Sequence, residues 1–259
     1  MASELSKDYL IEVAKDRVDN ASIIHKFGQS DAVGTTFVPV SRGNIYQTPQ
    51  AASATTLRIK AGGDAGDTTD GAGARAIMLQ GIDETGALAS EIVVTAGASA
   101  SSATTTTFMR LFRAFVYDSG AYATTAAGSH VDDIVIENGA GGTDWATIFS
   151  TGYPRAQTEI GMYTIPAGYV GYPISSYGFS DSSFTTELIF MKREKILDAD
   201  APYEGMRMLF GGKVEGGQFT LQPSSPFRVK GPADVGFLAK VNQTTATVEV
   251  GFELLLLKS

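Results

Sequence analysis

Residues 48–152 constrain the fold of this chain most strongly, because they are rich in Ala, Gly, Ser and Thr and form short β-prone runs between glycine-rich turns. Two of these runs, residues 75–83 and 90–95, flank a tight turn that contains Gly86. Glycine readily adopts the positive φ that closes a short hairpin loop, so the two runs predict a β-hairpin. A chain that uses its residues in this way forms surfaces and sheet edges, and the pattern favours a structural protein.

The distribution of β-prone segments predicts an all-β protein with a jelly-roll or β-sandwich fold. Residues 51–152 are predicted to form one β-sandwich part, and residues 153–259 a second part that completes or extends the sandwich. The clearest strand covers residues 245–257, where one alternating face is apolar. That face consists of Ala246, Val248, Val250, Phe252, Leu254 and Leu256.

Residues 1–50 are predicted to be an extended N-terminal arm with a short helix over residues 6–18. Ser6 can cap this helix, which is short enough to need a docking surface. Two extended segments, residues 22–28 and 34–41, follow it. We expect the arm to lie on another molecule; the alternative, equally open from the sequence, is that it packs on the chain's own domain.

The chain has a net charge of −8, only 19% charged residues and no cysteine. The negative charge disfavours binding to nucleic acid and to anionic membranes, so neither partner is expected. Without cysteine the chain has no disulfide framework, thiolate nucleophile or Cys-ligated zinc site, and no cofactor is predicted. The N-terminal residues are polar and partly acidic, unlike a secretory signal, so we expect synthesis in the cytoplasm.

Three carboxylates, Asp64, Asp67 and Asp70, lie in a glycine-rich loop ahead of Gly71. Carboxylate oxygens at a turn are the ligands that Ca²⁺ prefers. Their spacing differs from the EF-hand pattern, and no distal glutamate follows at the required place. We therefore retain the three aspartates only as weak metal candidates and predict no metal site.

Residues of the arm and of one later strand are the predicted partner contacts. The helix offers an apolar stripe, the extended segment after it carries a histidine and a lysine, and the run after residue 107 carries two arginines on opposite faces. The predicted contact residues are Tyr9, Leu10, Val13, Ile23, His25, Lys26, Phe27, Arg110 and Arg113.

The sequence selects no catalytic constellation. A glycosidase needs two carboxylates at a defined separation, which is a tertiary property, and no motif here singles out a pair. Several tyrosines could line a sugar-binding groove, although aromatic residues in a sandwich more often pack between its sheets. These candidates are Tyr153, Tyr169, Tyr172 and Tyr177.

Several motifs together resemble a pattern common in virion structural proteins of tailed bacteriophages, mostly those of marine hosts. The resemblance covers most of residues 25–175 and departs from the family at Tyr169, where the family usually has a basic residue. It rests on His25-Lys-Phe-Gly28, Asp67-Thr-Thr-Asp-Gly-Ala-Gly-Ala-Arg75, Gly81-Ile-Asp-Glu-Thr-Gly86, Ser90-Glu-Ile-Val-Val94, Thr107-Phe-Met-Arg-Leu-Phe-Arg-Ala114 and Tyr163-Thr-Ile-Pro-Ala-Gly-Tyr-Val-Gly-Tyr172.

The resemblance implies a non-enzymatic virion protein, for which we expect first a decoration or cement protein on the capsid exterior. Such a protein would be a homotrimer whose partner is the major capsid protein. The second hypothesis is a tail or fibre component that anchors a fibre or binds a host-surface glycan. The third is an enzyme such as a polysaccharide depolymerase, which the sequence supports least.

Overall fold

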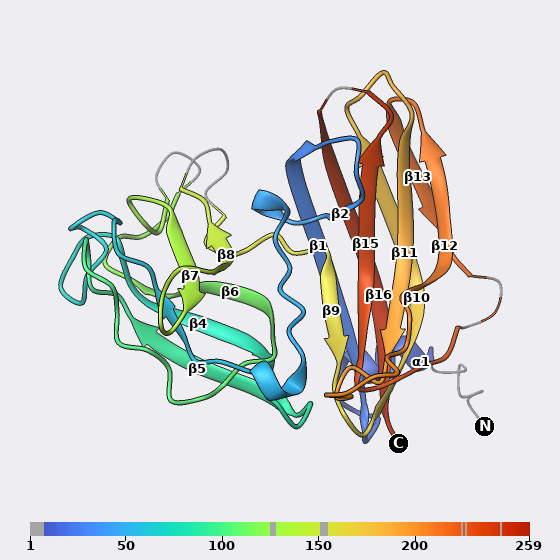
Figure 1. Cartoon of the computed structure of the whole chain (residues 1–259), viewed down its shortest axis with the longest axis horizontal. Helices are drawn as coiled ribbons and strands as arrows, with labels where there is room; N and C mark the ends of the chain where they lie inside the picture. Colours follow the sequence, from blue (N-terminus) through green and yellow to red (C-terminus); the bar gives the residue numbers. More distant parts are fainter. Residues whose placement is uncertain (1–7, 125–127, 151–154, 224, 226, 244) are drawn as a thin grey trace, which may run out of the picture.

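The protein, described from a computed structural model for residues 8–124, 128–150, 155–223, 225, 227–243 and 245–259, has a large and a small β-lobe that lie side by side (Figure 1). The all-β prediction is confirmed. Within the described residues the only α-helix is α1 (Tyr9–Ala14). Two short 3₁₀ turns, η1 (Arg42–Asn44) and η2 (Ala51–Ser53), lie in the segment that leads from the large lobe to the small lobe. No helix in these ranges is long and apolar enough to cross a membrane.

Two antiparallel sheets form the large lobe. The first has the order β1-β16-β10-β13, and the short strand β14 also pairs with β10. These strands are β1 (Ala21–Val33), β16 (Ala246–Lys258), β10 (Tyr169–Ser180), β13 (Gly217–Leu221) and β14 (Val229–Lys230). The second sheet has the order β12-β11-β15-β2, with β9 also paired to β15. Its strands are β12 (Arg207–Val214), β11 (Thr186–Glu194), β15 (Ala233–Val241), β2 (Val38–Pro39) and β9 (Met162–Ile165).

The pairing of these strands is that of a jelly roll. Taken in chain order, β1, β2, β10, β11, β12, β13, β15 and β16 pair first with last, second with seventh, third with sixth and fourth with fifth. The antiparallel double strand therefore folds over on itself and places its halves in two facing sheets. Strands β2 and β9 both pair with β15, one after the other along its length. The small lobe is therefore inserted in the chain between two strands that share one edge of the sheet.

The small lobe consists of two three-stranded antiparallel sheets, β5-β4-β6 and β3-β7-β8. Its strands are β3 (Leu57–Ile59), β4 (Ala74–Ile82), β5 (Leu88–Val94), β6 (Arg110–Ser119), β7 (Ile134–Asn138) and β8 (Asp144–Ile148). The predicted hairpin is β4–β5: Asp83 Oδ1 accepts the amides of Thr85 and Ala87, and Gly86 has a φ of 78°. Strand β8 was not among the strands predicted from the sequence.

The prediction of a separate arm over residues 1–50 is wrong for its strands. Strand β1 pairs with β16 from Ala21 to Val33, and β2 pairs with β15. These residues are part of the jelly roll itself, as the alternative expectation held. Helix α1 is also shorter than the predicted 6–18: Asp8 caps it at Leu10 and Ile11, it ends at Ala14, and Ser6 lies outside the described residues.

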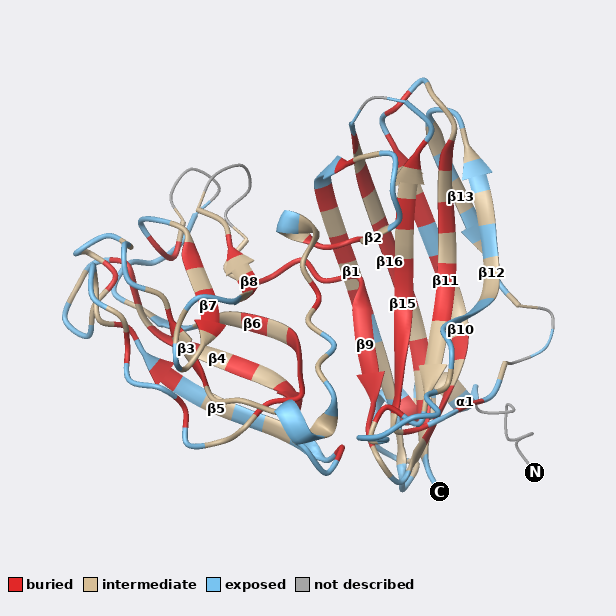
Figure 2. Cartoon of the chain, in the orientation of Figure 1, coloured by how far each residue is buried: buried red, intermediate tan, exposed pale blue. Residues whose placement is uncertain are grey.

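The apolar core of each lobe includes residues of the other lobe, and Figure 2 shows the buried stretches of each lobe. The predicted face of β16 is buried in the jelly roll. That core also takes in Met109 and Phe112 of the small lobe, while the small-lobe core around Trp145 takes in Met162 and Met191 of the large lobe. Shared burial of this kind fixes the position of one lobe against the other.

Candidate partner-binding surfaces

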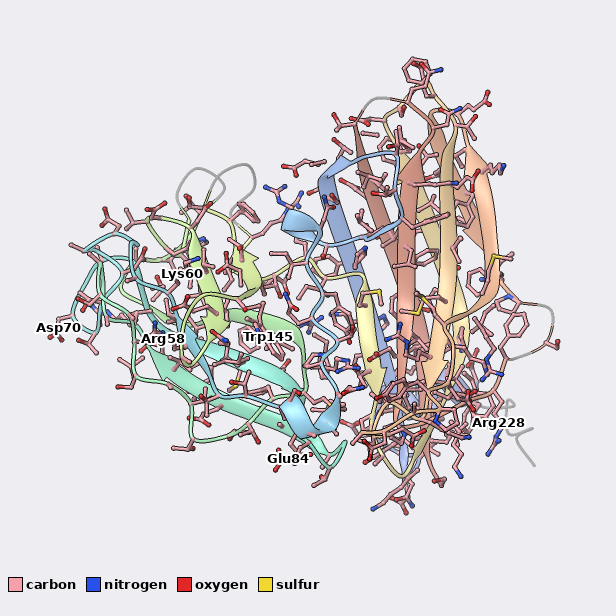
Figure 3. All side chains as sticks on the ribbon, in the orientation of Figure 1. Arg58, Lys60, Asp70, Glu84, Trp145 and Arg228 are labelled. Atoms are coloured by element: carbon pink, nitrogen blue, oxygen red, sulfur yellow. The ribbon has the colours of Figure 1, made fainter. Side chains whose placement is uncertain are left out.

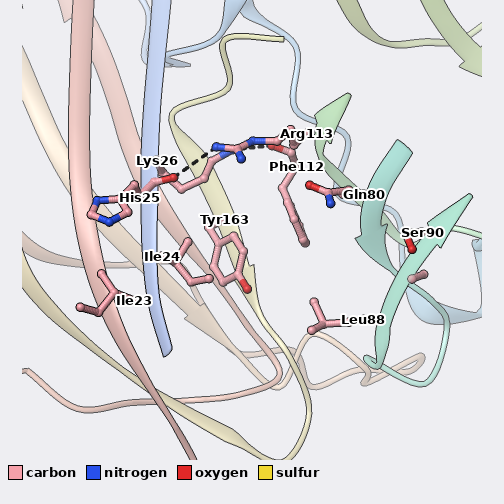
Figure 4. A pocket seen from close by; sticks show the side chains of 11 residues that line it. Ile23, Ile24, His25, Lys26, Gln80, Leu88, Ser90, Phe112, Arg113 and Tyr163 are labelled. Atoms are coloured by element: carbon pink, nitrogen blue, oxygen red, sulfur yellow. Dashed lines mark hydrogen bonds between the residues drawn. The ribbon is translucent and has the colours of Figure 1, made fainter. Parts of the chain in front are cut away.

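Four of the nine predicted contact residues line one groove between the lobes. Ile23, His25 and Lys26 come from β1 of the jelly roll, and Arg113 comes from β6 of the small lobe. Strands β4, β5 and β9 supply the other walls, and the cavity has a volume of about 440 Å³ (Figure 4). Residues from distant parts of the sequence thus meet at a site of the size that small ligands occupy.

Arg110 does not belong to this surface, and its prediction as a partner contact is wrong. Its side chain is 2% exposed, and its Nε and Nη2 donate to the carboxylate of Asp234 at 3.0 Å each. Nη1 donates to the Pro49 carbonyl at 2.7 Å. The Tyr46 hydroxyl and the Thr164 Oγ1 also donate to Asp234 Oδ1, at 3.4 and 2.8 Å. The arginine therefore links β6 of the small lobe to β15 of the large lobe.

Burial and the Asp234 charge together raise the pKa of Tyr46 well above its usual value. The tyrosine therefore stays a neutral hydrogen-bond donor in this cluster. The whole group is a structural connection between the lobes.

The helix residues differ in their exposure. Val13 is buried, so its prediction as a contact is wrong, whereas Tyr9 is exposed. Leu10 lines an apolar hollow with Tyr172 and Leu255, and Phe27 lines a separate groove beside Tyr177. The apolar stripe of α1 thus packs mainly against the chain's own strands.

The three loop aspartates do not converge on one point, and two of them, Asp64 and Asp67, hold the loop. Asp67 is buried, and its carboxylate accepts the amides of Ala74, Val131 and Asp132 at 2.7 to 3.1 Å. Asp64 Oδ1 accepts the amide of Gly66, and Figure 3 shows Asp70 at the outer end of the small lobe. Among the described residues, no three His, Cys, Asp or Glu side chains gather as metal ligands would.

Two cations without a counter-ion stand at one end of the inter-lobe groove. Lys26 is 6% exposed, and its Nζ donates to the Phe112 carbonyl and lies 5.8 Å from the Phe112 ring centroid. Arg113 Nη2 donates to the His25 carbonyl at 3.3 Å. Neither cation has an ion-pair partner in the described part of the chain, and no Asp or Glu lines the groove. Burial, and then the charge of Arg113, hold the pKa of Lys26 well below its usual value.

The outer face of the β5-β4-β6 sheet is a surface that was not predicted from the sequence. Leu88, Ile92 and Val94 of β5 are 58%, 43% and 51% exposed. Met78 pairs with Ile92 on one side and with Phe115 on the other, so the apolar residues adjoin across all three strands. The signal was present in Ile92-Val93-Val94, because three consecutive β-branched residues put apolar groups on both faces of a strand.

Strand β5 is also a sheet edge. Among the described strands it pairs only with β4, and its register turns the amides and carbonyls of Leu88, Ser90, Ile92 and Val94 away from β4. No backbone hydrogen bond to these outward groups occurs among the described residues. An exposed apolar edge strand is a template on which another chain can add a strand.

Glu91 holds strand β5 in place. Its carboxylate accepts the amides of Thr105 and Thr106 at 2.8 to 3.1 Å, which ties β5 to the loop that runs beside β3. The outer face of β5 is therefore a fixed surface on a braced strand.

Known proteins give no further guide to these surfaces: no family model, curated protein or solved structure matches the chain significantly.

Proposed function

We propose that this chain is a non-enzymatic structural protein of a bacteriophage virion, which decorates the outside of the major capsid lattice. The proposal joins the motif resemblance to one observation, the apolar outer face and open edge of β5. Monomeric proteins rarely leave such surfaces uncovered, and a surface of this kind typically binds another protein.

The small lobe is the part that docks in this proposal. Its outer face presents Leu88, Ile92 and Val94 beside Tyr117 of β6, all more than two-fifths exposed. In this proposal the jelly roll stands away from the lattice. We propose a homotrimer, because three weak docking faces on one rigid particle bind a repeating lattice far more tightly than one.

A second candidate function, recognition of a host-surface glycan by a tail or fibre, has its own supporting observation. Tyr177 is 45% exposed beside a polar groove that Gln29, Gln157 and Glu249 also line. An exposed aromatic ring next to amides and carboxylates is a surface that sugars can stack on and hydrogen-bond to. Of the other tyrosine candidates, Tyr172 lines a different, apolar hollow, and Tyr153 lies outside the described residues.

Copy number per virion tests the location. Quantitative mass spectrometry of purified particles, with the major capsid protein as the internal reference, should find the chain at close to one copy per capsid subunit. A copy number far below that of the capsid protein, as expected for a vertex or fibre component, would overturn the decoration proposal in favour of the tail. Absence from particles would overturn both.

A rebinding assay tests the docking face. Particles stripped of this protein are incubated with the wild-type chain or with Ile92→Lys, and bound protein is measured after sedimentation. The substitution places an uncompensated charge in the apolar face and should reduce binding strongly. Met208→Lys is the matched control, since Met208 is 64% exposed on β12 of the large lobe. Equal binding by Ile92→Lys and the wild type would refute the assignment of this face.

A further inference from the structure

The groove between the lobes combines a cationic end with apolar walls. Figure 4 shows Lys26 and Arg113 together at one end, and the rings of Phe112 and Tyr163 extending from there toward Leu88. Ile23 and Ile24 of β1 complete the apolar side, and Gln80 and Ser90 are the uncharged polar groups. The cavity is therefore amphipathic along its length.

Charge is unbalanced at the cationic end. The chain as a whole carries −8, yet this cavity contains two cations and no carboxylate. Burying a charge without a partner is costly, and the pKa of Lys26 is lowered accordingly. Lys26 donates one hydrogen bond to the Phe112 carbonyl, and Arg113 donates one to the His25 carbonyl. Both side chains therefore keep further N–H donors for a ligand.

We propose that the groove binds a monocarboxylate with an apolar chain, its carboxylate between Lys26 and Arg113 and its chain along Phe112, Tyr163 and Leu88. A carboxylate matches the planar fork of arginine and supplies the counter-charge that this end of the cavity lacks. The apolar walls favour a ligand with a hydrocarbon body over a compact, strongly hydrated anion such as phosphate. This site adjoins the docking face at Leu88, which borders both, but it does not depend on the proposed virion role.

Octanoate is the probe, used with the full chain in isothermal titration calorimetry. We expect saturable binding at about 10 mM or below, the range of a weak small-molecule site. Octanol has the same chain without the charge, octylammonium has the opposite charge, and inorganic phosphate has charge without the chain. Each of the three should bind about tenfold more weakly than octanoate, or not at all.

Substitutions locate the site. Lys26→Met and Arg113→Met keep the apolar stems and should each reduce octanoate affinity about tenfold or more. Lys213→Met is the matched control, because Lys213 is an exposed lysine on β12. It should bind octanoate like the wild type.

Gln80→Glu gives a test that does not depend on removing a buried group. Gln80 is the cross-strand neighbour of Arg113, so the new carboxylate would occupy the cationic end from within the chain. It should abolish octanoate binding while the melting temperature stays equal or rises. The proposal is overturned if the wild type does not bind octanoate, if octanol or phosphate binds equally well, or if folded Gln80→Glu binds octanoate as the wild type does.

Discussion

Replacing Asp234 by asparagine removes one charge from the buried pair that joins the lobes, with almost no change in volume. Arg110 and Asp234 are 2% and 1% exposed, so the arginine left behind cannot recover its lost partner from water. Breaking a buried pair in this way costs about 3–5 kcal/mol. A domain of this size loses roughly 2–4 °C in Tm per kcal/mol, so Tm should fall by about 6–20 °C.

Urea unfolding measures this loss with two probes, far-UV circular dichroism for all strands and the fluorescence of Trp145 for the small-lobe core. Coincident transitions would license a single free energy of unfolding. Glu187→Gln is the matched control. It also turns a carboxylate into an amide, but Glu187 pairs with Lys213 and Lys240, which are 68% and 31% exposed, so the loss should be about 0–1 kcal/mol.

The double variant Arg110→Met, Asp234→Leu separates loss of the pair from the cost of an unpaired charge. With both charges gone, its stability should lie closer to the wild type than that of Asp234→Asn. The reasoning is refuted if Asp234→Asn costs no more than the surface control, or if the double variant is the less stable of the two.

Three further predictions concern the small lobe. Partial burial alone would raise the pKa of Glu91, but hydrogen bonds from the 105–106 loop hold it below the usual 4.5. The ionised Glu91 therefore stabilises the fold above pH 4.5, and this stabilisation is lost as pH falls through the lowered pKa. The free energies of unfolding in urea of Glu91→Gln and the wild type should therefore become equal in acid. A difference between them that does not change with pH would contradict this prediction. Gly81→Ala should cost about 1–3 kcal/mol in thermal unfolding, because the new Cβ would lie 1.9 Å from a carbonyl oxygen of β6, and an unchanged Tm would contradict the close approach. Asp67→Ala should cost about 2–3 kcal/mol by the loss of three amide hydrogen bonds, whereas Asp70→Ala serves as the control and should leave the urea midpoint unchanged.

The two arginines of β6 show where reasoning from the sequence stops. Their spacing puts them on opposite faces of a strand, and that much follows from the alternation of side chains. Which of them is buried depends on Asp234, which lies 124 residues further along the chain. The same limit applies to the groove, whose walls come from β1, β4, β5, β6 and β9.

Strand identity was decided locally. The β4–β5 hairpin and the apolar face of β16 follow from period-two alternation and from a glycine in the turn, which involve only near neighbours. These features fixed the all-β class of the protein. The isolated segment at residues 22–28 was also recognisable as extended, yet its place was open.

The tertiary structure alone decided what the strands do. β1 becomes part of the jelly roll because β16, more than 200 residues away, offers it a free edge, and local sequence holds no record of such a partner. The packing of the lobes brings Lys26 of β1 to Arg113 of β6 and buries the lysine. Backbone preference acts over a few residues, whereas burial and charge pairing act between any residues that the fold brings together, which is why the sequence determined the strands and the fold determined the surfaces.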